Sequence, residues 1–138
     1  MPKFSPNSKQ KLLTCHYDLQ RLFNNVIKHR DCTVIFGHRG ENEQNEAYRT
    51  GNSLLAWPHS THNKVPSLGI DVMPYYDIEP HIRWEDTMAV YEFSGFVKGI
   101  ASQMGIVIRH GYDWDMDNDF GDQTFMDGAH YELVLDSE

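Results

Sequence analysis

Four side chains in the middle and C-terminal parts of the chain have the types and spacing of a catalytic metal site. Eight residues separate His62 from Asp71, and two residues separate Asp127 from His130. Two imidazoles and one carboxylate are a complete ligand set for a zinc ion that keeps its fourth position for water. Taken one at a time, a histidine is more often a surface or hydrogen-bonded residue, and a strand aspartate more often pairs with a lysine or arginine. As a set, His62, Asp71 and His130 are candidate zinc ligands and indicate a site that activates water for hydrolysis.

Asp127 has two interpretations. It begins the sequence Asp-Gly-Ala-His, and Asp-Gly is a common turn pair. A carboxylate three positions before a ligand histidine can also act as the general base on the water that the metal holds. With a metal at the site, the catalytic interpretation is favoured.

A second run of acidic residues precedes this motif. Asp113, Asp115, Asp117 and Asp119 offer carboxylate oxygens at alternating positions, and oxygen ligands suit calcium. The run lacks the glycine and the glutamate of an EF-hand loop at the required positions. A calcium site and a solvated acidic loop both remain open.

Hydrophobic spacing predicts the elements that position these side chains. Apolar residues at three- and four-residue steps predict a helix from Asn7 or Ser8 to about residue 29 and a second helix over Trp84–Met104. A short polar helix is expected over Glu41–Arg49 and an irregular loop over residues 51–67. The predicted strands are Cys32–Phe36, Leu68–Met73, Ile106–Arg109 and Ala129–Leu135. This order favours an α+β fold with a small antiparallel sheet flanked by two long helices.

Alternation along two of these strands separates core residues from site residues. Ile70 and Val72 would face the core, so Asp71 would face away from it, and His130 and Glu132 would share one face of the last strand. A polar side chain that projects from the middle of a strand needs a partner.

Length, charge and the absence of long apolar runs limit the number of domains and the kinds of partner that the chain can have. The 138 residues are expected to form one catalytic domain over 1–138, and a net charge of −8 argues against nucleic acid as a partner. No apolar run is long enough for a membrane helix, and the N-terminus lacks the apolar stretch of a signal peptide. We expect a monomer without stable membrane association, made in the cytoplasm. Cys15 and Cys32 are expected to be buried free thiols.

The combined motifs resemble a known family. Ser-x-His followed by Gly-Ile-Asp-Val-x-Pro, and then Asp-Gly-x-His-x-Glu-Leu, are similar to the zinc peptidases of the D-alanyl-D-alanine carboxypeptidase (VanY-like) group. Within that group the chain most resembles the phage L-alanyl-D-glutamate endopeptidases, which act as endolysins. The similarity covers most of the chain and implies a zinc DD-peptidase/hedgehog-like fold. It also implies that His62, Asp71 and His130 bind zinc and that Asp127 is the catalytic carboxylate.

The resemblance adds three further site residues. Arg39 matches a family arginine near the substrate, where a guanidinium can stabilise an oxyanion or hold a carboxylate; an ion pair at a turn is the alternative. Ser60 and Gln44 match positions that would contact the substrate or support the site. Two features depart from the pattern: the interval between His62 and Asp71 is longer than usual, which can reshape one wall of the site, and His110 precedes Gly111 with no expected role.

The resemblance implies an enzyme that cuts the L-Ala–D-Glu bond of peptidoglycan stem peptides and reaches the cell wall once the membrane is breached. Such an enzyme would serve host lysis and have antimicrobial activity. Two alternatives remain: a D,D-carboxypeptidase that removes terminal D-Ala, and a noncatalytic zinc- or wall-binding module. Retention of Asp127 argues against the last, because metal binding alone does not need a base there.

Overall fold

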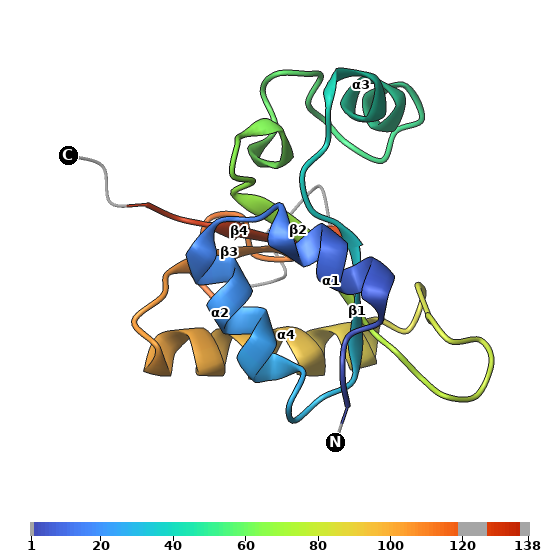
Figure 1. Ribbon diagram of the computed structural model, residues 1–138, viewed down its shortest axis with the longest axis vertical. Helices are drawn as coiled ribbons and strands as arrows, with labels where there is room; N and C mark the ends of the chain where they lie inside the picture. The colour runs from blue at the N-terminus through green and yellow to red at the C-terminus, as the bar shows by residue number, and fades with distance from the viewer. Residues whose placement is uncertain (1, 119–126, 136–138) are drawn as a thin grey trace.

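The computed structural model describes residues 2–118 and 127–135, and all structural statements below concern this part of the chain. It contains four α-helices, one short 3₁₀ helix and a sheet of four strands in the order β1-β2-β4-β3 (Figure 1). Every neighbouring pair in the sheet is antiparallel. The predicted α+β class with a small antiparallel sheet is confirmed.

The strands lie close to their predicted positions. β1 spans Cys32–Phe36, β2 Gly69–Pro74, β3 Ile108–Gly111 and β4 Asp127–Leu133. β1 has the predicted bounds, whereas β4 begins two residues before its predicted start. Asp127 is therefore the first residue of a strand and is paired with Gly111 of β3.

The first long helix predicted from the sequence is wrong. Two shorter helices, α1 (Pro6–Leu13) and α2 (Tyr17–Val26), replace it. The chain breaks at Cys15, which forms a β-bridge with Ser67; the Ser67 N–H donates to the Thr14 carbonyl and the His16 N–H donates to the Ser67 carbonyl. These bonds to a distant segment replace helical bonds, and the His16 ring then caps α2 by accepting from the Asp18 N–H.

The other helices match their predictions more closely. α3 spans Glu41–Arg49, as predicted, and α4 spans Thr87–Gln103. α4 starts three residues later than expected because Asp86 caps it, its carboxylate accepting from the Ala89 N–H. None of the helices in the described residues is long and apolar enough to cross a membrane.

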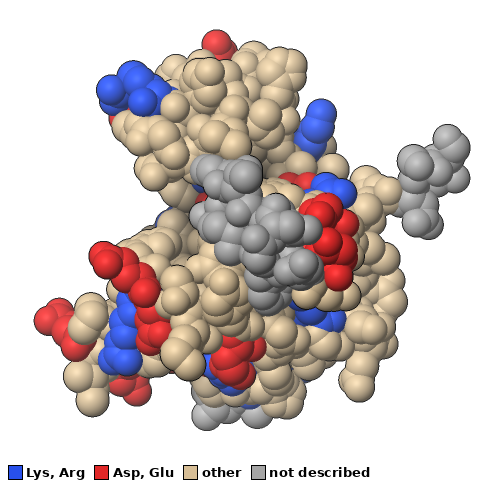
Figure 2. Space-filling view, turned by 180° about the vertical axis from the view of Figure 1, so that it is seen from behind, with Lys and Arg blue, Asp and Glu red and all other residues tan. Residues whose placement is uncertain are grey.

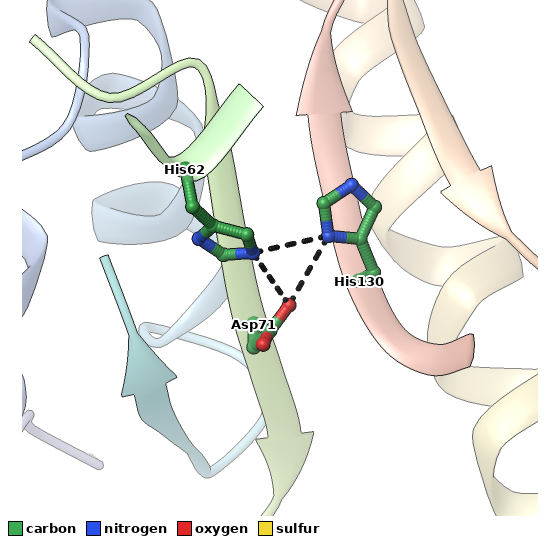
Figure 3. A group of neighbouring side chains, drawn as sticks. All are labelled: His62, Asp71 and His130. Atoms are coloured by element: carbon green, nitrogen blue, oxygen red, sulfur yellow. Dashed lines mark hydrogen bonds and ion pairs between the residues drawn. The ribbon is translucent and has the colours of Figure 1, made fainter. Parts of the chain in front are cut away.

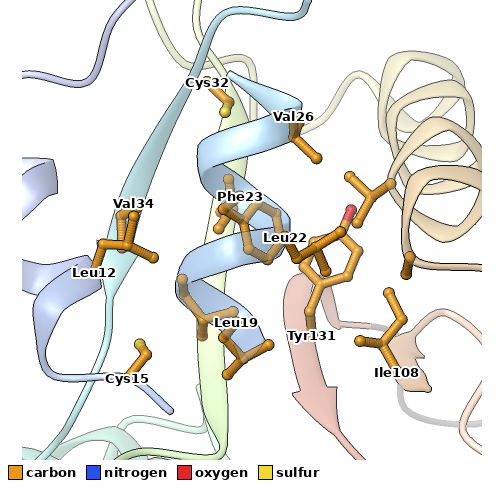
Figure 4. Close-up of a cluster of buried hydrophobic side chains, with 14 of the residues drawn as sticks. Leu12, Cys15, Leu19, Leu22, Phe23, Val26, Cys32, Val34, Ile108 and Tyr131 are labelled. Carbon is orange, nitrogen blue, oxygen red and sulfur yellow. The ribbon is translucent and has the colours of Figure 1, made fainter. Parts of the chain in front are cut away.

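The core lies between the sheet and the helices α1, α2 and α4 (Figure 4). Leu19, Leu22 and Phe23 of α2 are fully buried against Tyr131 of β4, whose ring meets the Phe23 ring edge to face. Further members of this core are Leu12, Cys15, Val26, Cys32, Val34, Ile70, Val72, Phe93, Val97, Ala101, Ile108 and Leu133. Both cysteines are buried free thiols, as predicted, and burial raises the pKa of each to about 12.

The opposite side of the sheet carries the polar residues. Ile70 and Val72 pack in the core, so the alternation of β2 directs Asp71 away from it, as predicted. The segment with α3 and the 3₁₀ helix η1 (Thr61–Asn63) lies beyond that side of the sheet (Figure 1). The sheet therefore separates the main hydrophobic core from the side on which Asp71 lies.

Charged residues are spread over the surface. In the face shown in Figure 2, lysine and arginine side chains occur in small groups with acidic side chains between them. Among the described residues of this face, no basic side chains gather into an extended patch. This distribution agrees with the net charge of −8.

Candidate metal centre

Three of the predicted ligands converge on one point (Figure 3). Asp71 is in the middle of β2, His130 is its cross-strand partner on β4, and His62 is on η1. The His62 Nε2 atom lies 3.1 Å from Asp71 Oδ1 and 3.2 Å from His130 Nδ1. The distance from His130 Nδ1 to Asp71 Oδ1 is also 3.2 Å, and all three side chains are buried. The structure therefore brings the whole predicted ligand set together.

The donor atoms fit a metal ion. His62 Nδ1 lies 2.8 Å from the Gly37 carbonyl oxygen, which can only accept, so that nitrogen carries the proton and Nε2 presents a lone pair. His130 Nε2 lies 2.8 Å from Glu132 Oε1 and donates to it, which leaves Nδ1 facing the other ligands. Donors at about 2.0 Å from a tetrahedral zinc are about 3.3 Å apart. The observed separations and the nitrogen–oxygen donor set suit zinc.

The charges at this point also favour a cation. Burial alone would raise the pKa of Asp71, but the adjacent His62 and His130 hold it well below its usual range. Burial alone would lower the pKa of His130, yet hydrogen bonds to Asp71 and Glu132 raise it to about 10. An ionised Asp71 next to a His130 that holds positive charge marks a position where a metal ion can replace a proton.

η1 lies within the segment predicted to be an irregular loop and fixes His62. Ser60 caps η1, its hydroxyl accepting from the His62 N–H at 3.2 Å, while the Asn63 side chain accepts from the Ser60 N–H. The Asn63 amide also donates to the Arg39 carbonyl, and the Arg39 N–H donates to the His62 carbonyl. Ser60 thus supports the ligand and also lines the cleft beside it. Asn63 had no assigned role in the sequence analysis.

The longer interval between His62 and Asp71 turns away from the cleft. Val65, near its tip, is 84% exposed, and Ser67 is anchored to the break between α1 and α2. Among the described residues, none from 63 to 68 lines the cleft. The expected change to a cleft wall is therefore not found in this interval.

Arg39 and Gln44 form a chain of hydrogen bonds behind Asp71. Arg39 is 5% exposed, and its Nη2 donates to Asp71 Oδ2 at 2.9 Å. Its Nη1 donates to Gln44 Oε1 at 3.1 Å, and the fully buried Gln44 amide donates to Ser53 and to the Leu55 carbonyl. Gln44 is therefore a support of the site. Arg39 lies at the edge of the cleft and holds the second oxygen of a ligand carboxylate.

His62 and His130 form part of the lining of a cleft of about 730 Å³, and Asp71 lies behind them. One wall comes from the segment after α3, including Asn52, Ser53, Leu54, Leu55 and His59. The lining also includes Trp114 and Asp115, and the Trp114 ring centroid is 5.4 Å from that of His130. Arg39, Ser60, Thr61, Asp127 and Glu132 complete the lining near the ligands. A cleft of this volume is large enough for a small ligand or part of a peptide.

Asp127 is held in this cleft by close contact between β3 and β4. A Cβ atom added to Gly111 would overlap the Asp127 carbonyl group, so the two backbones approach closely only because residue 111 is glycine. Burial and the nearby Asp71 raise the pKa of Asp127 above its ordinary value. A half-buried carboxylate with a raised pKa beside metal ligands is suited to proton transfer.

His110, which had no expected role, supports the same backbone. It is buried between the rings of Tyr112 and Tyr131, and its Nε2 donates to the Gly128 carbonyl at 2.8 Å. The Tyr112 N–H donates to its Nδ1 at 3.4 Å. His110 is therefore a neutral structural residue beside Asp127.

Lowering the pH from 6.5 to 4 is expected to destabilise the fold through His110. Burial lowers its pKa from 6.5 to about 4, so in this window the unfolded chain binds a proton that the folded chain excludes. The contribution to the free energy of unfolding is complete above pH 6.5, and about 3 kcal/mol is lost as the pH falls to 4. Urea unfolding at several pH values measures this loss.

The matched variant is His110→Gln, which keeps an amide donor for Gly128 but does not titrate. Its stability should fall less than that of the wild type across the same pH window. Equal losses in the two proteins would contradict the role assigned to His110.

The acidic run is partly brought together. Oxygens of Asp113, Asp115 and Asp117 lie within 4.8 Å of one another, and Asp119 lies outside the described residues. Asp113 is buried; its carboxylate accepts from the N–H groups of Asp117 and Asn118. Lys98 Nζ is 3.6 Å from Asp113 Oδ2. The carboxylates therefore form a compact group next to one wall of the cleft.

Comparisons with known proteins place the chain in a family. The family model of the phage L-alanyl-D-glutamate peptidases matches residues 1–134. The chain is 29% identical over 137 residues to the L-alanyl-D-glutamate peptidase of Escherichia phage T5, covering 96% of this chain and 98% of that protein. Its fold is similar to that of the Serratia marcescens L-Ala D-Glu endopeptidase ChiX, with a TM-score of 0.71, 22% identity, and coverage of 96% of this chain and 91% of the other. This chain belongs to the phage L-alanyl-D-glutamate peptidase family.

Proposed function

We propose that this chain is a zinc-dependent endopeptidase that hydrolyses the L-Ala–D-Glu bond in the stem peptides of bacterial peptidoglycan. Its 138 residues act as a single catalytic domain of the zinc DD-peptidase type. The observation that carries the proposal is the convergence of His62, Asp71 and His130 beside a cleft that His62, His130 and Asp127 line. Membership of the family supports the substrate and the bond.

The proposed chemistry divides between the ion and the protein. His62, Asp71 and His130 would hold the zinc ion, which would act as a Lewis acid on the scissile carbonyl and on the attacking water. Asp127 removes a proton from the attacking water and then gives a proton to the amine of D-Glu as the peptide bond breaks. The raised pKa of Asp127 suits both steps, because the carboxyl must accept a proton and release it again.

Arg39 has two parts in this proposal. Arg39 Nη2 donates to Asp71, and Gln44 fixes the Arg39 guanidinium by accepting from Nη1. A guanidinium has five N–H donors, so donors remain for the oxygen that becomes negative during attack or for a substrate carboxylate. Ser60 supports the His62 backbone and is placed at the cleft to contact substrate.

The products of digestion test the reaction. Purified peptidoglycan incubated with the zinc-loaded protein should yield fragments with a new N-terminal D-Glu, identified by mass spectrometry. Release of free D-Ala instead would identify a D,D-carboxypeptidase. Failure to release any fragment, with zinc bound, would leave only the noncatalytic module. Parallel digests with a chelator should show no cleavage.

We further propose that Asp113, Asp115 and Asp117 bind a calcium ion. Three carboxylates within 4.8 Å offer the oxygen donors that calcium prefers. Calorimetric titration with calcium should give saturable binding that weakens in Asp115→Asn. A solvated acidic loop, the alternative from the sequence, predicts no saturable binding.

A further inference from the structure

Glu132 contacts the outer nitrogen of a ligand histidine. Its Oε1 lies 2.8 Å from His130 Nε2, on the side of the ring opposite to Nδ1. Residues 130 and 132 are two apart on β4, so the strand places both side chains on the same face of the sheet. The imidazole of His130 therefore lies between the Glu132 carboxylate and the point where the ligands converge.

Neighbouring elements fix Glu132 in turn. Arg109 is its cross-strand partner on β3, and Arg109 Nη1 donates to Glu132 Oε2 at 2.7 Å. The Thr61 hydroxyl donates to Glu132 Oε1 at 3.4 Å from the residue next to His62. The Glu132 side chain is 12% exposed. Glu132 is thus bonded to residues of β3, β4 and η1 at the same time.

Gly69 provides the space for this arrangement. It is the cross-strand partner of Glu132 on β2. A Cβ atom at position 69 would lie 3.2 Å from His130 Cε1 and would collide with the Thr61 hydroxyl. A glycine in the middle of the sheet lets the imidazole and the hydroxyl approach the strand.

The two ligand histidines are oriented by different groups. His62 Nδ1 donates to the Gly37 carbonyl, a neutral acceptor that the backbone fixes. His130 depends instead on a carboxylate side chain, which Arg109 and Thr61 hold. An ionised partner keeps the proton on the outer nitrogen and makes the inner nitrogen a stronger electron donor.

We infer that Glu132, held by Arg109, is a positioning residue that sets the tautomer of His130 and strengthens its bond to the metal. This inference rests on the proposed zinc site. It adds Glu132 and Arg109 as the pair that fixes the protonation and orientation of His130. Loss of such a partner typically lowers metal affinity by about 10- to 100-fold. The sequence motif Asp-Gly-x-His-x-Glu includes Glu132, but its role follows from the contacts.

Zinc affinity tests this inference without depending on turnover. Competition with a chromophoric chelator should show about 10- to 100-fold weaker zinc binding in Glu132→Gln than in the wild type. Glu92→Gln is the matched control, because Glu92 makes an ion pair with Arg30 on the surface and lies outside the cleft lining. It should bind zinc as the wild type does. Wild-type affinity in Glu132→Gln would overturn the inference.

Two further measurements separate positioning from a purely structural role. Histidine ¹⁵N NMR of the zinc-loaded wild type should show His130 with its proton on Nε2, and a proton on Nδ1 would overturn the inference. If Glu132→Gln does not fold, Arg109→Met decides, because it keeps the carboxylate but frees it from its anchor. Weaker zinc binding in Arg109→Met supports the inference, and unchanged binding overturns it.

The wild type distinguishes failure of this inference from failure of the proposed function. A wild-type protein that binds no zinc would overturn both. Tight zinc binding by both the wild type and Glu132→Gln would overturn the inference alone and leave the proposed zinc peptidase intact.

Discussion

Asp127→Asn is expected to lower kcat for cleavage of the stem peptide by about 10²- to 10⁴-fold while the protein keeps its zinc. Asparagine has the shape of aspartate but cannot accept the proton of the attacking water. Asp127 lies on the cleft lining outside the set of converging ligand atoms, so the metal content should not change. Metal analysis and turnover of a soluble stem peptide, measured on the same preparation, check both parts.

Asp77→Asn is the control for this experiment, since it makes the same chemical change at an exposed position. It should retain both zinc and activity. If Asp127→Asn turned over substrate at the wild-type rate, Asp127 would lose its role as general base. A loss of zinc in that variant would instead make Asp127 part of the metal site.

His62→Ala and His130→Ala are expected to lose zinc and activity together. Each removes one of three ligand atoms that lie 3.1–3.2 Å apart, and the two that remain no longer form a complete zinc site. Metal analysis after dialysis should find substoichiometric zinc in both variants. Peptidoglycan cleavage should fall to the level of the chelator-treated wild type.

His59→Ala is the matched control for zinc content, because His59 lines the same cleft but is not in the ligand set. It should keep stoichiometric zinc. Full activity of His62→Ala without bound metal would show that hydrolysis needs no metal at this position.

The sequence was sufficient for the parts of the site that depend on local pattern. Alternation along β2 and β4 predicted which way Asp71 and His130 face, because a strand has a period of two. The bounds of β1 and α3 follow from local signals: a β-branched apolar run and glycines at either end of a polar helix. The types and order of the ligands were enough to predict their convergence.

The features that the sequence did not predict depend on contacts between distant residues. The apolar spacing from Leu12 to Val26 continues through Cys15, and only pairing with Ser67 breaks the helix. Arg109 of β3 and Thr61 of η1 donate hydrogen bonds to Glu132, and its position in a sequence motif could not reveal these contacts. The two-residue spacing of His130 and Glu132 was visible in the sequence, but the proximity of Arg109 was not.

Residues at the break between α1 and α2 support the segment that orients His62 at the predicted metal site. The Thr14 hydroxyl accepts from the His38 N–H, and Gly37 packs so closely on Lys11 and Thr14 that a side chain would not fit there. The Gly37 carbonyl is the group that orients His62. Proteolysis of the first sixteen residues, or a fusion partner that disturbs them, would therefore disturb the orientation of His62, which lies almost fifty positions further along the chain. The best site for an affinity tag is accordingly away from this end.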